Sequence, residues 1–203
     1  MPARKRPVAK AKRFWKTLVS EAAEMHRAVF GEGFEALRRA HSRVRELLDA
    51  AEAPFMYERT NEGNDLVLLF TPEWDLDEAA ELDWFVSLAP PIPAWKLYTR
   101  RQRKDCDMAF DLLANALNAV ARDARFAVVA VEGGVHITMH SRVWDEFTTT
   151  GREGCVRFFL SHALGEQLMM DRVPTVALAP PAHGAKLLTA ENMVKAVDMV
   201  AAV

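Results

Sequence analysis

The chain has 203 residues, half of them hydrophobic and 27% charged, a composition that is typical of globular proteins. Two isolated cysteines, Cys106 and Cys155, lack the patterned even spacing of a secreted disulfide-rich domain, and no apolar run approaches the ~18 residues that span a bilayer. The sequence therefore predicts a cytoplasmic protein that does not enter a membrane and needs no disulfide or metal to fold.

The net charge is unevenly distributed along the chain. It is −2 overall, but residues 1–16 hold seven basic residues and no acidic one, which leaves −9 on the remainder. We predict a flexible basic tail over residues 1–12. Such a tail can contact nucleic acid, but no aromatic residue lies among its charges before Phe14, so we favour a solvated terminus.

The first half of the chain reads as two helices, a hairpin, a helix and a strand. Apolar residues at helical spacing predict one helix from Phe14 and another from Phe34, with glycines between them. On the second helix His41 lies on the apolar stripe and is expected to be a core histidine. The strands are expected over residues 55–60, 65–71 and 94–99, and Asp75 is expected to cap the helix that precedes the last of them.

The second half repeats this order. After the charged segment 100–104, Asp105 is expected to cap a helix, and residues 126–131 and 135–141 form a hairpin around two glycines. Thr150 with Glu153 predicts a capping box, followed by one continuous helix, a strand over 174–179, and a final helix capped by Thr189.

These elements predict an α+β fold with a mixed or antiparallel sheet covered by helices. We expect a single domain over residues 13–203, built from two similar helix-ββαβ halves at about 13–100 and 105–203. The halves share a tryptophan-aspartate pair after each hairpin but little other sequence, so the repeat can be one of topology alone.

Three short motifs are distributed along most of the chain. They are Phe14-Trp15, the segment 89–95 that reads APPIPAW, and Leu164-Gly165-Glu166 within the late helix. In this ordered set the chain resembles a group of uncharacterised bacterial proteins. The resemblance implies an α+β fold, and it carries over no activity and no catalytic residue.

Two histidines are the candidates for a metal site. His136 and His140 lie four residues apart on one predicted strand and therefore on the same face. They could share a metal only with a further ligand such as Glu58, Asp65 or Glu132. We expect instead that they lie on a half-exposed sheet face, and that the protein binds no metal or other cofactor.

No catalytic set is evident. Ser161 and His162 are neighbours on a helix and point about 100° apart, so they do not meet as nucleophile and base. Cys155 is expected to be a buried, unreactive thiol, and Cys106 lies between two aspartates.

Three residues are the candidates for partner binding. Trp84, next to Asp83, falls off the inner face of its helix and is the tryptophan that we expect to be most exposed. His183 lies in a proline- and glycine-containing loop of the kind that often carries function.

We therefore predict a non-catalytic protein that binds a protein partner, such as an immunity protein that neutralises a cognate toxin. The alternatives are an enzyme or ligand-binding protein that uses the second hairpin, and nucleic-acid contact through the basic tail. The sequence leaves the oligomeric state open.

Overall fold

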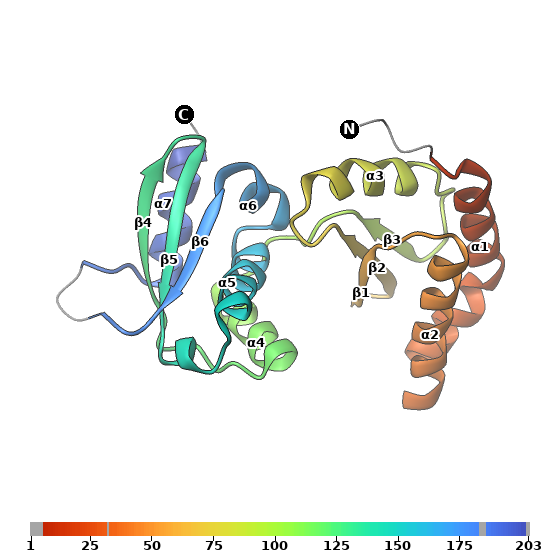
Figure 1. The fold of residues 1–203 in the computed structure, drawn as a ribbon. Helices are drawn as coiled ribbons and strands as arrows, with labels where there is room; N and C mark the ends of the chain where they lie inside the picture. The colour runs from red at the N-terminus through yellow and green to blue at the C-terminus, as the bar shows by residue number, and fades with distance from the viewer. Residues whose placement is uncertain (1–5, 32, 183–185, 202–203) are drawn as a thin grey trace. The chain divides into compact units, whose positions relative to one another are not determined.

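The computed structural model describes residues 6–31, 33–182 and 186–201, without the side chains of residues 149, 150 and 201 (Figure 1). The chain divides into two compact units, Met1–Thr99 and Arg100–Val203, hereafter unit 1 and unit 2. Each unit holds a three-stranded mixed sheet with helices packed around it, so the fold is α+β, as predicted. In the described part of the chain, no helix has the length and apolar character needed to cross a membrane.

Unit 1 places its helices on one face of a small sheet. Its elements are α1 (Val8–Gly31), α2 (Phe34–Ala50), β1 (Met56–Glu62), β2 (Asp65–Thr71), α3 (Leu76–Ser87) and β3 (Trp95–Tyr98). β1 and β2 form an antiparallel hairpin, and β3 returns to pair in parallel with β2. As predicted, the Asp75 side chain caps α3 by accepting hydrogen bonds from two backbone N–H groups.

The first helix begins earlier than the sequence predicted. α1 starts at Val8, not at Phe14, because Ala11 extends the buried stripe by one turn and its N–H bonds to the carbonyl of Pro7. The basic residues at this end are anchored: Arg6 forms an ion pair with Glu81, and Lys10 forms one with Glu52.

An aromatic cluster forms the centre of unit 1. Trp15 of α1 is 1% exposed and lies edge-on to Phe70 of β2, with the ring centroids 6.0 Å apart. Its indole Nε1–H donates a 2.8 Å hydrogen bond to the Phe85 carbonyl of α3. This bond satisfies the polar atom of a buried side chain and fixes α1 against α3.

Unit 2 has the same strand order and pairing as unit 1. Its elements are α4 (Cys106–Leu117), β4 (Arg125–Val131), β5 (Gly134–His140), the 3₁₀ turn η1 (Arg142–Asp145), α5 (Thr149–Ala163), α6 (Glu166–Arg172), β6 (Thr175–Ala179) and α7 (Ala190–Ala201). β4 and β5 are antiparallel, and β6 pairs in parallel with β5. The two units are therefore similar in the order and pairing of their strands. That they arose by duplication stays a prediction.

The late helix of unit 2 is broken, although the sequence predicted a continuous one. Gly165 has φ +82°, a left-handed conformation that ends α5 and lets α6 begin at Glu166. The Glu166 N–H donates to the Arg101 carbonyl, and the two side chains form a buried ion pair of 3.3 Å. The predicted capping box is also wrong, because α5 begins at Thr149 and its cap is Thr148, whose side chain accepts from the Gly151 N–H.

Candidate functional site

The tryptophan proposed as a contact residue lies under an arginine. Trp84 is half-buried on α3 against the core of unit 1, and the guanidinium carbon of Arg6 lies 5.2 Å from its ring centroid. Asp83, beside it, is exposed. His183, the third candidate, lies outside the described residues.

The two strand histidines lie on one half-exposed face of β5, as predicted, and both are engaged within unit 2. The ring nitrogens of His136 lie 2.8 Å from the Thr175 hydroxyl and 3.0 Å from the Thr138 hydroxyl. His140 Nδ1 donates a 2.9 Å hydrogen bond to the Pro180 carbonyl. Within the described residues, no three His, Cys, Asp or Glu side chains gather closely enough to hold a metal ion.

Both cysteines are buried, which was predicted for Cys155. Burial raises the pKa of Cys106 to about 11 and that of Cys155 to about 12, and nearby carboxylates act in the same direction. Both thiols are therefore protonated at neutral pH, which removes the thiolate that nucleophilic chemistry needs.

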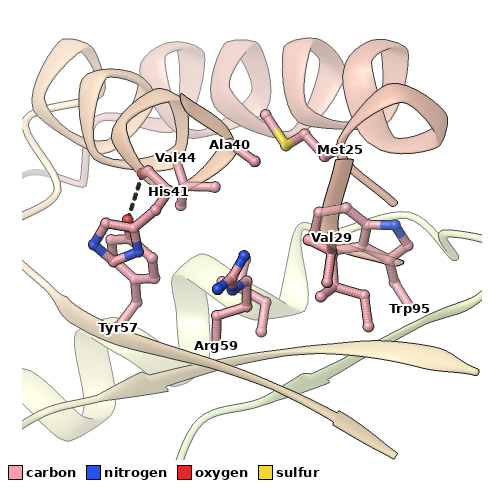
Figure 2. Close-up of a pocket in the computed structure, with 10 residues that line it drawn as sticks. Met25, Val29, Ala40, His41, Val44, Tyr57, Arg59 and Trp95 are labelled. Atoms are coloured by element: carbon pink, nitrogen blue, oxygen red, sulfur yellow. Dashed lines mark hydrogen bonds between the residues drawn. The ribbon is translucent and has the colours of Figure 1, made fainter. Parts of the chain in front are cut away.

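A pocket in unit 1 brings together residues from five elements (Figure 2). It lies between the α1–α2 pair and the sheet, and its cavity volume is about 10 Å³, which is room for about one water molecule. Most of the wall is apolar, with Trp95 at one end. The lining residues are Met25, Val29, Ala40, His41, Val44, Tyr57, Arg59, Leu66, Leu68 and Trp95.

Arg59 is the one charged residue in this lining. Figure 2 shows its side chain rising from β1 toward the helices, between the His41–Tyr57 pair and the Val29–Trp95 pair. Its Nη1 is buried and has no hydrogen-bond partner among the described residues. A buried N–H without an acceptor costs roughly 1–3 kcal/mol, and more on a charged group.

The neighbours of Arg59 add no negative charge. Burial raises the pKa of Tyr57 to about 12, although the cations Arg45 and Arg59 act against this, so the phenol stays protonated at neutral pH. Partial burial, together with Arg59 and Arg45, lowers the pKa of His41, which makes its ring neutral at pH 7. Burial also lowers the pKa of Arg59 itself. The part of the pocket around Arg59 therefore carries a positive charge, and no residue of the pocket lining is a counterion.

His41 does not occupy the core position that the sequence predicted. The residue is exposed, and its ring lies over Tyr57 with the centroids 4.8 Å apart. The Tyr57 hydroxyl donates a 2.6 Å hydrogen bond to the His41 carbonyl, which ties β1 to α2 beside Arg59. The prediction failed because the buried stripe of α2 runs through Ala40, Val44 and Leu48, and His41 lies beside it.

The sequence analysis also missed Arg59, because its unusual position becomes evident only from the register of the hairpin. In the antiparallel register Arg59 pairs with Leu68, and Tyr57 pairs with Phe70, so all four share the face that packs on the helices. A charged residue opposite leucine on the core face of a hairpin is unusual and marks a site that needs a partner.

Comparisons with family models, curated proteins and solved structures returned no match to this chain. The resemblance to the uncharacterised bacterial group therefore stays a prediction. The case for a function rests on the pocket alone.

Proposed function

We propose that the protein is a non-catalytic binding protein that holds an anionic group of its partner against Arg59 in the unit 1 pocket. The observation that carries this proposal is the buried Nη1 of Arg59, which has no acceptor among the described residues. The residues that line the pocket include no carboxylate. An anion beside Arg59 would accept from this donor and neutralise the charge of the half-buried guanidinium.

The lining supports binding in preference to catalysis. Tyr57 already donates its hydroxyl hydrogen to a backbone carbonyl, and no serine, cysteine or acidic residue lines the pocket as a nucleophile or base. The remaining polar groups are the Arg59 guanidinium and the Trp95 indole N–H, which donate hydrogen bonds, and the neutral His41 ring, which finds no nucleophile in this lining to activate.

The experiment is an NMR titration of the full chain with sodium acetate, phosphate and sulfate. We expect saturable shifts of the Trp95 indole N–H and of the methyl groups that line the pocket. Arg59→Gln should abolish these shifts. Arg39→Gln is the matched control, because Arg39 is an exposed arginine on α2 outside the pocket lining. The absence of a saturable shift with every anion would overturn the proposal.

An immunity protein that acts in the cytoplasm is one form of binding protein that agrees with this proposal. It would hold an anionic group of its toxin in the pocket. Co-purification with the product of an adjacent gene should then be lost in Arg59→Gln and kept in Arg39→Gln. Equal recovery with both variants would count against it.

A further inference from the structure

A second feature of the molecule, independent of the pocket, is the free edge of the sheet in unit 2. Figure 1 shows β4 at one side of this sheet, where β5 is its neighbouring strand. Residues 127–131 of β4 read AVVAV, without a charge or a proline. We infer that this edge pairs in antiparallel orientation with the same edge of a second copy, which makes the two sheets continuous across a homodimer.

The backbone of β4 presents hydrogen-bonding groups along this edge. Phe126 exchanges backbone hydrogen bonds of 2.9 and 2.8 Å with Leu188, so its N–H and C=O point away from β5. In an antiparallel ladder the direction of these groups alternates, so those of Val128 and Ala130 also point away from β5. Within the described residues neither of them has a partner on that side. The edge is therefore open from Val128 to the hairpin turn.

The side chains along this open edge are apolar and exposed. Val129 is 55% exposed, Val131 is 40% exposed, and Ala130 between them is also exposed. An exposed apolar edge strand is a template for pairing with a further strand, and proteins commonly protect such edges with charges, prolines or bulges. Pairing would also remove the two valines from water.

The equivalent edge of unit 1 is protected. By register, residues 60–62 of β1 correspond to residues 129–131 of β4. They are Thr60, Asn61 and Glu62, all polar and exposed, and Glu58 adds a second carboxylate to the same strand. An added strand would have to desolvate these groups. The lack of protection is therefore specific to the edge of unit 2.

A second copy fits this edge because the segment is complementary to itself. In antiparallel pairing centred on Ala130, the two Ala130 residues exchange backbone hydrogen bonds, and Val129 of each copy lies opposite Val131 of the other. This register uses residues 128–132, so Leu188 keeps its place beside Phe126.

The charges at the two ends of the edge also agree with an antiparallel pairing. One end carries Arg125 and the exposed Lys186, which precedes Leu188 by two residues, and the turn at the other end carries Glu132. The pairing brings Glu132 of each copy to the basic end of the other, so opposite charges meet. Two acids near the basic end already interact with cations of their own, Asp123 with Arg142 and Glu191 with Lys195.

The test is sedimentation of the full chain over a range of concentrations. Pairing of a single short strand buries less than the roughly 1,200–2,000 Å² of stable interfaces, so we expect a dissociation constant on the order of 10⁻⁵ M. Val129→Lys should abolish the dimer, because an ammonium group would then face Val131 of the second copy. Thr60→Lys is the matched control at the equivalent position of β1, and it should dimerise like the unaltered chain.

Two variants at Ala130 test the backbone pairing and its register. Ala130→Pro removes an N–H that points away from β5, so it should abolish the dimer and leave the hairpin folded, as judged by circular dichroism. Ala130→Cys should give a disulfide-linked dimer with oxidised glutathione as the oxidant, since paired residues lie about 5.5 Å apart between Cα atoms. Asn61→Pro and Asn61→Cys are the controls on β1 and should change neither result.

A chain that stays monomeric up to about 1 mM, two orders of magnitude above the expected dissociation constant, overturns the inference. A dimer that survives both Val129→Lys and Ala130→Pro also overturns it, because that dimer would form through another surface. A monomer that instead binds an extended peptide of alternating valine and threonine at β4 assigns the edge to a foreign strand and overturns the second copy as its occupant. These outcomes are independent of anion binding at Arg59, which Arg59→Gln tests.

Discussion

The two units have the same strand order, yet they differ in the residues on the sheet face that packs against the helices. The hairpins have equal strand lengths and equivalent registers, so Tyr57 and Arg59 of β1 correspond to Phe126 and Val128 of β4. Unit 2 places apolar residues at both positions, as a core face requires. Unit 1 places a phenol and a guanidinium there, which packing alone does not explain. Unit 2 thus uses this face for packing, and the difference at Tyr57 and Arg59 is what supports our proposal that unit 1 uses it for binding.

The largest expected effect concerns a difference between the two hairpin turns. Gly134 of β5 has φ +155°, and an added Cβ would lie 2.1 Å from the Arg172 carbonyl oxygen, whereas unit 1 has Asp65 at the corresponding position. We expect Gly134→Ala to lower the free energy of unfolding by about 4 kcal/mol, since β5 and α6 must separate. Urea denaturation measures this change.

The neighbouring glycine provides the control for that experiment. Gly133 also has a positive φ, +80°, but its added Cβ would meet nothing within 4 Å. Gly133→Ala should therefore cost only about 1 kcal/mol, from backbone strain alone. Equal losses in the two variants would show that the close approach to α6 is unimportant.

The second prediction concerns His162 of α5, a buried histidine in unit 2, in contrast to the exposed His41 of unit 1. His162 is 2% exposed, and burial, with Arg101 and Lys104, lowers its pKa to about 3. Below pH 6.5 the unfolded chain binds a proton that the folded chain does not, so stability falls as the pH falls. The loss should be about 1.4 kcal/mol per pH unit, or about 2 kcal/mol at pH 5.

The variant His162→Gln isolates this contribution. Other groups also titrate in this range, so the measured quantity is the difference in pH dependence between the two proteins in urea denaturation from pH 7 to pH 4. We expect a shallower decline in the variant. Parallel curves would mean that His162 has the same pKa in the folded and the unfolded chain.

The third prediction concerns a substitution that gives the sheet face of unit 1 the residue found at the corresponding position of unit 2. Arg59→Val introduces the residue type of Val128 and removes a half-buried guanidinium whose Nη1 has no partner among the described residues. We expect the free energy of unfolding to rise by about 1 kcal/mol while anion binding is lost, because binding sites trade stability for function. A large loss of stability would instead assign Arg59 a structural role.

The smallest expected effect concerns a feature that the units share. Arg6 lies over Trp84 in unit 1, and Arg152 lies 4.6 Å from the ring centroid of Trp144 in unit 2. Arg6→Gln should cost about 0.5 kcal/mol, since its ion pair with Glu81 is partly exposed. Arg152→Gln should cost about twice as much, because Arg152 Nε also donates to the Trp144 carbonyl. Thermal denaturation of both variants tests this order.

Local signals in the sequence determined most of the secondary structure. The helix caps at Asp75, Asp105 and Thr189 were predicted and are present, because a capping bond joins residues two or three positions apart. Both hairpins follow from alternation and turn residues in the same way. The early start of α1 was missed because basic residues surround the apolar residues of its first turn. The break at Gly165 was missed because the residues that pack against Gly165 are Arg101 and Arg103, more than sixty positions away in the chain.

What the sequence by itself determined is therefore the α+β class and the order of the elements. The tertiary structure alone decided the site. In the sequence Arg59 is an ordinary strand residue. In the structure the hairpin register places it opposite Leu68, and α1 and α2 cover the face on which it lies. The burial of its Nη1 depends on contacts between residues far apart in the chain, and those contacts leave no pattern in the sequence around position 59.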